Sequence, residues 1–475
     1  MIFSSKIEKL IFYNFPTILF SLLPIFLITG PFLSDLSISL VSLLFLTFCS
    51  IKKNFSYFQN KYFYFFLTFW VYLIINSLII NFILDSLKIS FFLFRYGVFV
   101  IAITTFLIVD NKFIKYFFFS IFLCFSVLIF DGFFQFFTGE NIFGYKSPSV
   151  FRVSSLFGDE MILGSYISRL WPIFFGLSIF FLKKKNNFFF ILILIFILSE
   201  VLIFLSGERV AFFYINLSAL FVILFSAKLL KLRLFTLLSS LLLVIVISFF
   251  NPTAKERIID STLKQMNLLS TEENKDPEIY IFSQQHTHHY ITAYRMFLDN
   301  KILGVGVKNF RNFCNDKKYE ESKASCSTHP HNSYIQILTE TGIIGFSFII
   351  FALFFFVTYL IKHCIYKLRG KKLFSDFEIC LLSGLLIFLW PFAPTGNVFN
   401  NWIIIITILY LPFLIRGSVN ISGDKIKNKK ITKILKKSKS RKKLKKNNKK
   451  KIKKNKKKSK QIKKVRESQS FKRKI

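Results

Sequence analysis

Long apolar runs are the feature that most constrains what this chain can fold into. The sequence has 475 residues, 53% of them hydrophobic. Apolar stretches of roughly 17–25 residues, the length that crosses a bilayer as a helix, recur along it. Lipid offers the backbone no hydrogen bonds, so each stretch must satisfy its own as a helix. We therefore predict an all-α, polytopic membrane protein.

The apolar runs predict about twelve transmembrane helices. Nine fall within residues 1–250 and three within residues 333–416. Residues 251–332 interrupt them as one large hydrophilic loop, and residues 417–475 follow as a lysine-rich tail. To within several residues the predicted spans are 16–33, 35–51, 62–82, 90–109, 114–137, 162–182, 188–205, 209–227, 233–251, 333–361, 377–394 and 399–415.

Positive charge indicates the side of the membrane on which each loop lies, because Lys and Arg gather in cytoplasmic loops. With a cytoplasmic N-terminus, the short outside connections hold Lys88, Lys146, Arg152 and little else. We therefore predict that both termini are cytoplasmic and that the 251–332 loop lies in the periplasm. The inside connections then hold Lys52, Lys53, Lys61, Lys112, Lys115, Lys183, Lys184, Lys185, Lys228, Lys231, Arg233, Lys362, Lys367, Arg369, Lys371 and Lys372.

The tail carries most of the formal net charge of +39. From Lys425 to Ile475 it holds 28 Lys and Arg against one acid, Glu467. Such a composition buries no core, so we predict a disordered cytoplasmic extension that lies on anionic membrane lipids. Nucleic acid is the rival polyanion, but the lysines are not interleaved with aromatic residues that stack on bases. No nucleic-acid partner is expected.

Two of the six cysteines, Cys314 and Cys326, share the large loop. Outside the cytoplasm such a pair can oxidise, so we predict a disulfide, with two free thiols as the alternative.

Imidazoles stand where this loop enters the tenth predicted span, in the run Thr328-His329-Pro330-His331-Asn332-Ser333. A His that titrates near neutrality takes a proton from a hydroxyl, so His331 and His329 are candidate bases. An interfacial His that only hydrogen-bonds headgroups or backbone is the alternative. Polar residues at helical spacing inside the span favour a helix facing protein or water, and small residues permit close helix approach. These residues are Gln336, Glu340, Thr341, Gly342 and Gly345.

Arginines near the same outer face are the second kind of candidate. A guanidinium near lipid is costly unless paired, and its fork matches phosphate oxygens. Arg209 lies at an outer turn directly after Glu208, and Arg295 lies in the large loop. A salt bridge with Glu208 or snorkelling is the alternative for Arg209. Arg95 and Arg169 lie inside predicted spans, and Arg152 lies in a smaller outside loop.

Other chemistries lack their motifs. The sequence has no P-loop, no nucleophile elbow and no HExxH. The run His286-Thr287-His288-His289 could bind zinc together with a cysteine, but metal spacing is absent elsewhere. We predict neither a metal nor a cofactor.

Arginines and an imidazole at the outer leaflet suit transfer from a lipid-linked diphosphate. Negative charge grows on the diphosphate as the sugar–phosphate bond breaks, and guanidinium groups stabilise that charge. The imidazole takes the proton from an incoming sugar hydroxyl. A glycan is thereby moved from its lipid carrier to an acceptor.

Several segments match the pattern of a known family. They are His329-Pro330-His331-Asn332-Ser333-Tyr334 with Gly342 and Gly345, Ser206-Gly207-Glu208-Arg209, Tyr294-Arg295 with Asp299, Gly304-Val305-Gly306 and Phe310, Asp131-Gly132 with Gln135, Thr138-Gly139 and Gly144, Arg152-Val153-Ser154 with Phe157-Gly158, and Trp390-Pro391-Phe392 with Gly396 to Trp402. On these segments the chain resembles the O-antigen ligase and O-antigen polymerase family of bacterial envelopes.

The resemblance implies a C-type, glycosyltransferase-like fold in the inner membrane. It implies metal-independent transfer of an undecaprenyl-diphosphate-linked glycan on the periplasmic face. His331 is then the base, and Arg209 and Arg295 bind the diphosphate, with His329, Arg95 and Arg152 as further candidates. The favoured acceptor is lipid A–core; a glycan acceptor in O-antigen polymerisation is the close rival, and transfer to protein is a third outcome.

A secondary transporter is the alternative from a different class. Twelve spans and buried arginines suit it, but we see neither discontinuous midplane helices nor two related halves.

Overall fold

The computed structural model describes residues 5–80, 83–110, 112–147, 152–181, 187–227, 230–250, 255–266 and 282–417, without the side chains of residues 179–187 and 250. The prediction for the lysine-rich tail falls on residues beyond 417, outside the described part. The lysines at 183–185 and residues 267–281 of the large loop lie outside it as well.

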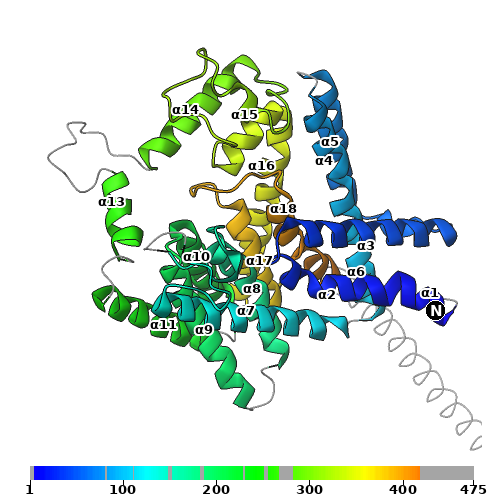
Figure 1. The fold of residues 1–475 in the computed structure, drawn as a ribbon. Helices are drawn as coiled ribbons and strands as arrows, with labels where there is room; N and C mark the ends of the chain where they lie inside the picture. The colour runs from blue at the N-terminus through cyan, green and yellow to red at the C-terminus, as the bar shows by residue number, and fades with distance from the viewer. Residues whose placement is uncertain are drawn as a thin grey trace, which may run out of the picture. The chain divides into compact units, whose positions relative to one another are not determined.

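Every regular element of the described residues is a helix, and their one β-contact is an isolated bridge between Glu140 and Lys146 (Figure 1). The all-α prediction is confirmed. The helices are α1 (Lys6–Lys9), α2 (Phe15–Phe26), α3 (Pro31–Ile51), α4 (Lys61–Ile79), α5 (Leu84–Phe92), α6 (Phe94–Val109), α7 (Phe113–Thr138), α8 (Leu163–Phe181), α9 (Asn187–Leu205), α10 (Arg209–Phe225), α11 (Leu230–Phe250), α13 (Ser261–Gln265), α14 (Gln284–Asp299), α15 (Phe310–Phe313), α16 (Ser333–Leu368), α17 (Asp376–Leu389) and α18 (Asn401–Ile408).

Eight helices of the described residues are long and apolar enough to cross a membrane, and this is a membrane protein. All twelve predicted spans overlap helices, but some of these helices are short. The 14 residues of α17 extend about 21 Å, against a hydrocarbon core of about 30 Å. The number twelve therefore stays a prediction. The eight are Lys6–Phe26, Pro31–Ile51, Lys61–Ile79, Leu84–Val109, Phe113–Thr138, Phe188–Leu205, Leu230–Phe249 and Ser333–Leu368.

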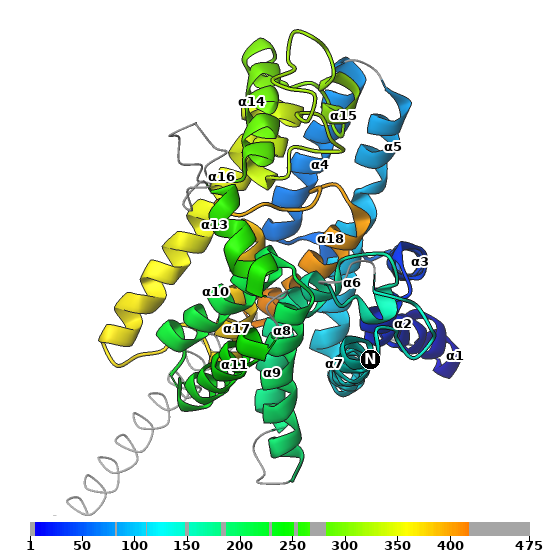
Figure 2. The same ribbon diagram turned by 60° about the vertical axis from the view of Figure 1, so that its left-hand side comes forward.

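Aromatic side chains fill the contacts between these helices. In α8 the rings of Trp171 and Phe175 stack with centroids 4.6 Å apart, and Phe196 of α9 packs against both. α8 contacts α7, α9, α10 and α17, and Figure 2 shows it among them. Other Phe side chains face outward, such as Phe249 at 81% exposure, because lipid tails are as apolar as a protein core.

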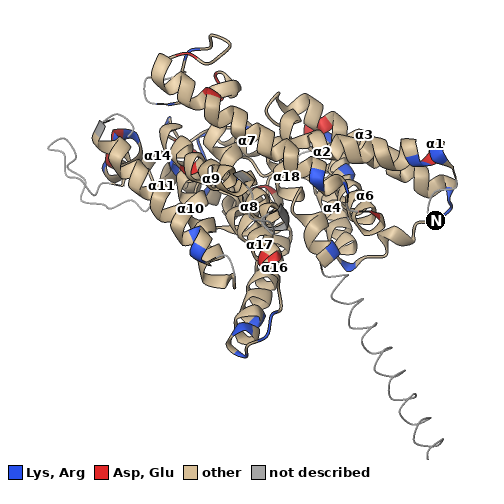
Figure 3. Cartoon of the chain, turned by 90° about the horizontal axis from the view of Figure 1, so that it is seen from below, with Lys and Arg blue, Asp and Glu red and all other residues tan. Residues whose placement is uncertain are grey.

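Two arginines inside the helices have carboxylate partners. Arg95 of α6 pairs with Asp35 of α3 at 2.6 Å. Arg233 is fully buried in α11 and pairs with Glu200 of α9. Arg233, counted above with a cytoplasmic connection, therefore lies in the first turn of a helix, where a buried carboxylate on a neighbouring helix compensates its charge. Figure 3 shows Lys and Arg mainly at helix ends and in connections.

α16 is broken at Gly342. This residue has φ +63° and ψ −170°, a backbone conformation that is almost confined to glycine. The predicted tenth span is therefore two helical pieces, residues 333–341 and 343–368. The second piece, about 39 Å long, is sufficient by itself to cross a bilayer. Gly345 allows a close approach of α4, since an added Cβ would lie 3.0 Å from Tyr72 Cε1.

The large loop satisfies the backbone groups that this break releases. Val305 donates its N–H to the Thr339 carbonyl, and Gly306 donates to the Glu340 carbonyl, both at 2.9 Å. On the other side of the break, the Ile343 N–H donates to a loop carbonyl at 2.9 Å. Loop and helix are therefore joined by backbone hydrogen bonds, as in a sheet edge, although no strand forms among these residues.

Glu340 is the polar centre of this junction. Its carboxylate is fully buried and accepts the backbone N–H of Lys308 at 2.9 Å and of Phe310 at 3.4 Å. Gln336 Nε2 donates to it at 3.1 Å and also to Asn397 at 3.0 Å. The polar residues at the start of α16 face protein, which confirms one of the two predicted environments.

Candidate functional site

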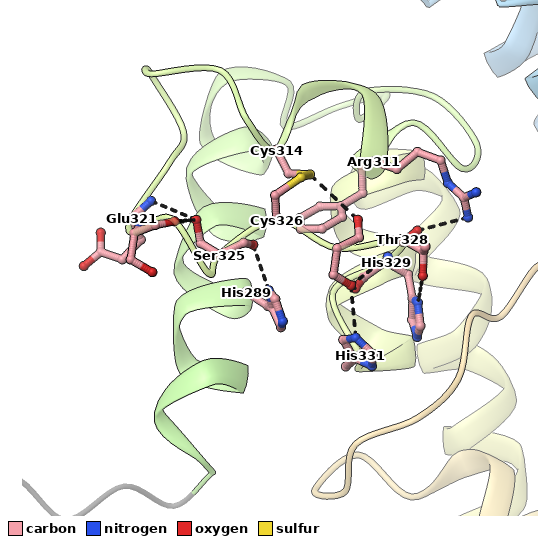
Figure 4. The surroundings of a disulfide bond; sticks show 12 residues. His289, Arg311, Cys314, Glu321, Ser325, Cys326, Thr328, His329 and His331 are labelled. Atoms are coloured by element: carbon pink, nitrogen blue, oxygen red, sulfur yellow. Dashed lines mark hydrogen bonds between the residues drawn. A yellow bond between two sulfur atoms is a disulfide. The ribbon is translucent and has the colours of Figure 1, made fainter. Parts of the chain in front are cut away.

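The large loop has a small core of its own. A disulfide joins Cys314 to Cys326, whose Cα atoms lie 5.0 Å apart, and this is the pairing that the sequence predicted (Figure 4). Cys314 is fully buried against the apolar face of α14. The other buried members of this core are Ala293, Met296, Val305 and Phe310. The loop is therefore a folded layer that can hold polar side chains in fixed positions.

Four imidazole rings meet between α14 and the segment that leads into α16. The His331 ring centroid lies 4.1 Å from that of His329, 5.3 Å from that of His289 and 5.4 Å from that of His286. His286 and His289 share one face of α14, because residues three apart are neighbours on a helix. Figure 4 shows His289, His329 and His331 on the same side of the disulfide. We call these four residues the histidine cluster.

Backbone carbonyls assign the tautomers of two rings. His289 Nδ1 lies 2.7 Å from the Ser325 carbonyl oxygen. A carbonyl only accepts, so Nδ1 carries the proton and Nε2 carries the lone pair. His329 Nε2 lies 3.1 Å from the Thr395 carbonyl oxygen, so in this ring Nε2 carries the proton.

A hydroxyl assigns the tautomer of His331. Ser327 Oγ donates its single proton to the His329 carbonyl at 2.9 Å, and it lies 3.0 Å from His331 Nε2. Because a hydroxyl has one proton, Ser327 accepts from Nε2 when it donates to the His329 carbonyl, and we assign the His331 lone pair to Nδ1 on this basis. The backbone of His331 has φ +57°, and its carbonyl accepts the Thr395 N–H at 2.8 Å. A left-handed non-glycine residue is held there by its surroundings and is typical of functional sites.

Three rings of the histidine cluster, those of His286, His329 and His331, resist protonation. Burial lowers the pKa of His331 to about 3, and the neighbouring imidazoles lower it further. Burial, His289 and the positive charge of Arg209 lower the pKa of His286 to about 4. Burial also lowers the pKa of His329. These three rings are therefore neutral at pH 7, and each has one unprotonated ring nitrogen.

Three guanidinium groups lie near one another and near this cluster. Arg209 begins α10, Arg152 precedes α8, and Arg257 lies in the π-helical turn Glu256–Asp260. Arg257 and Arg152 both act on Arg209 through their charges, and Arg209 acts on His286. Burial and Arg257 lower the pKa of Arg152, whereas Glu208 raises it. Mutually repelling guanidinium groups favour an anion among them.

Glu208 is committed to another partner. Its carboxylate accepts the N–H groups of Gly164 at 2.6 Å and Ser165 at 2.9 Å, in the first turn of α8, where a negative charge is favoured. Burial raises the pKa of Glu208, and these hydrogen bonds together with Arg152 oppose that rise. The described ion pairs include none between Glu208 and Arg209, so the salt bridge weighed for Arg209 is not formed.

Arg209 and Arg152 instead donate to neutral atoms. Arg209 reaches Thr262 Oγ1 at 3.3 Å and Gln265 Oε1 at 2.8 Å. Arg152 Nε donates to the Ser206 carbonyl at 3.1 Å. A phosphate can replace neutral acceptors of this kind at little cost, because its hydrogen bonds to a guanidinium are charge-assisted.

Two predicted site residues have other partners. Arg95 pairs with Asp35 between α6 and α3, and no described contact joins it to the histidine cluster. Arg295 lies two turns after His288, on a different face of α14 from His289. It pairs with Glu321 and donates to the Glu320 carbonyl at 3.0 Å. Of the predicted site residues, the structure therefore brings together His329, His331, Arg209 and Arg152. The described contacts of Arg95 and Arg295 are with other residues.

The sequence reasoning did not include three residues of the site. His286 and His289 were weighed only as zinc ligands, although their spacing of three on an amphipathic helix indicates a shared face. Arg257 has no sequence signal that separates it from other loop arginines. Among the described residues no group of three or more His, Cys, Asp or Glu is placed to hold a metal ion.

Comparison with family models matches residues 190–350 to the family described as O-antigen ligase. The chain carries an O-antigen ligase-like domain. The matched segment includes Arg209, Arg257, the histidine cluster and the disulfide, and it excludes Arg95 and Arg152. The match points to ligase- or polymerase-type glycan transfer. Comparison with curated proteins found no match.

Proposed function

We propose that this protein transfers an undecaprenyl-diphosphate-linked O-antigen polysaccharide to a lipid A–core acceptor, on the periplasmic face of the inner membrane. The observation that supports this most is the cluster of neutral imidazoles beside Arg152, Arg209 and Arg257. It combines a proton acceptor with an anion site, and the O-antigen ligase match covers most of it.

In the proposed step the acceptor hydroxyl oxygen attacks the anomeric carbon of the donor sugar. The new glycosidic bond forms as the bond from that carbon to the diphosphate oxygen breaks, and undecaprenyl diphosphate leaves with the bonding electrons. His331 takes the hydroxyl proton on Nδ1, the nitrogen that carries its lone pair. Arg209, with Arg152 and Arg257, stabilises the charge that grows on the diphosphate. Arg295 joins this site only by exchanging Glu321 for the diphosphate.

Polymerisation of O-antigen units is the second candidate, because it uses the same donor and differs only in the acceptor. The family match is compatible with both. Gel electrophoresis of lipopolysaccharide from a deletion strain distinguishes ligation from polymerisation. Ligation is supported by a lost ladder with lipid-linked polymer accumulating, and polymerisation by a single-repeat band. An unchanged ladder contradicts both.

A matched pair of variants tests the assignment of the base. His331→Ala is expected to abolish the ladder in the complemented strain, because general-base catalysis contributes about 10²–10⁴-fold. His288→Ala is the control, since His288 bonds Ser322 at 2.8 Å on another face of α14. A fully active, normally inserted His331→Ala protein removes His331 from this role.

A further inference from the structure

Residues 325–328, which we call the orienting segment, hold three rings of the histidine cluster. The Ser325 carbonyl accepts His289 Nδ1–H, and Ser327 Oγ accepts His331 Nε2–H. Thr328 Oγ1 lies 2.9 Å from His329 Nδ1, which is unprotonated and therefore accepts its proton. Cys326 lies between the two serines and forms the disulfide with Cys314.

We propose that the Cys314–Cys326 disulfide, Ser325 and Ser327 are positioning elements that hold the catalytic imidazoles in one tautomer and orientation. The inference rests on the proposed function, in which His331 is the base. It goes further by explaining what fixes the tautomer of His331 and why a disulfide lies beside the base. The orienting segment acts on transfer only through the imidazoles.

The disulfide is suited to this task because its far end lies in a buried core. Cys314 follows α15 and is fully buried in the core of the large loop. Its Sγ lies 3.8 Å from the Ser327 carbonyl oxygen, a contact rather than a hydrogen bond because a disulfide sulfur has no proton. Arg311, in α15 itself, donates to the Thr328 carbonyl at 3.1 Å. The orienting segment is therefore tied to α15 at both Cys326 and Thr328.

Without these ties the segment depends on local contacts. Ser325 Oγ donates to the Ser322 carbonyl at 2.6 Å, and Ser327 donates to the His329 carbonyl. Both are bonds within one loop, and loops without cross-links sample many conformations. Since Ser327 accepts from His331 only in one arrangement, a mobile segment lets His331 exchange tautomers and turn its lone pair away from the substrate.

The tautomers can be measured directly by imidazole ¹⁵N NMR on the full chain in lipid nanodiscs. In the wild-type protein we expect one His331 tautomer, with protonated Nε2, assigned by loss of its signals in His331→Gln. In Ser327→Ala, and in the double variant Cys314→Ser/Cys326→Ser, we expect mixed tautomers. The turnover rate should fall by up to about 100-fold, because small misplacements of a reacting group cost that much. KM for the lipid-linked donor should stay unchanged.

Matched controls isolate the effect. Ser327→Thr keeps a hydroxyl and is expected to restore both the single tautomer and the rate. Ser322→Ala removes the partner of His288, and Cys364→Ser removes a free cysteine in α16; neither should change His331. A Ser327→Ala protein that keeps a single tautomer and the full rate overturns the proposal. If Ser327→Ala shows tautomer exchange but His331→Ala keeps its full activity, only the proposed function is contradicted. The positioning of the ring is then real, but His331 is not the base.

Discussion

At the scale of residues, the site combines buried imidazoles with nearby guanidinium groups, and this environment disfavours protonation of the imidazoles. His331 lies against three other imidazoles, and His286 also experiences Arg209. Burial disfavours a charge on His331 and His286, and a proton on either ring would also be repelled by Arg209 or by a second protonated ring. His331 and His286 therefore stay neutral, which separates the proton acceptor from the arginines that can bind an anion.

Stability should depend on pH through the histidine cluster. The pKa of His331 is about 3 and that of His286 about 4, against an ordinary value of 6.5, so the unfolded chain binds more protons between these limits. The stability that neutral rings provide is complete above pH 6.5 and is lost as the pH falls toward 3. We expect the thermal midpoint in detergent to drop across this window, and the drop to be smaller in His286→Gln/His331→Gln. An equal drop in both proteins contradicts the lowered pKa values.

Arginine variants should differ by position. Arg209→Ala is expected to lower transfer by about 10²–10³-fold, because it removes a donor to the leaving diphosphate. Arg295→Ala should resemble Glu321→Ala, since the ion pair between them is the contact both lose. Transfer rates in proteoliposomes with lipid-linked donor check this. A loss in Arg295→Ala as large as in Arg209→Ala, with Glu321→Ala active, places Arg295 at the diphosphate.

At the scale of elements, the break in α16 links the membrane helices to the large loop. Gly342 interrupts the helical hydrogen bonds, and the loop around Gly304 supplies replacements. An added Cβ on Gly304 would lie 2.5 Å from the carbonyl carbon of Glu340. The loop and α16 can therefore come into backbone contact here only because Gly304 has no side chain. The start of α16, which directly follows His329 and His331, is thereby fixed to the layer that holds α14.

Gly342→Ala should therefore unfold this junction. The added Cβ would lie 2.2 Å from the Ile302 carbonyl oxygen, and the φ of +63° is strained for alanine. We expect a loss of about 3 kcal/mol or more in the free energy of unfolding, and loss of transfer. Gly370→Ala is the control, because Gly370 also has positive φ but nothing lies within 4 Å of its added Cβ. Similar thermal midpoints for the two variants contradict the close approach.

At the scale of the whole molecule, the orientation in the membrane remains a prediction with one structural support. A disulfide persists in oxidising compartments and is rare in the cytosol, so Cys314–Cys326 favours a large loop outside the cytoplasm. The lysine-rich inside connections favour the same orientation. With this orientation, the histidine cluster lies on the outer side of the membrane together with the large loop.

Removal of the tail should separate lipid contact from chemistry. The tail holds 28 Lys and Arg from Lys425 to Ile475, and each lysine near an anionic surface contributes about 1 kcal/mol. A chain ending at Gly417 is expected to keep its transfer rate within about two-fold while losing its preference for anionic over zwitterionic vesicles. Loss of transfer in both kinds of vesicle gives the tail a part in the reaction.

The sequence predicted those site residues that lie next to one another and next to a recognisable membrane span. His329 and His331 lie two residues apart and directly precede a span, so their placement followed from the helix pattern. His286 and His289 lie some forty residues earlier and reach His331 only because α14 packs against α16. Arg295 and Arg257 are both loop arginines by sequence, and only packing separates their partners.

The sequence by itself determined that this is an all-helical membrane protein, because apolar runs have one stable form in lipid. It also determined the kinds of group at the site, since a base beside arginines requires particular side chains. Only the tertiary structure decided which histidines and arginines meet, where α16 breaks and which nitrogen of His331 carries the lone pair. Those facts depend on contacts between segments far apart in the chain, and such contacts leave no periodic or local pattern to read.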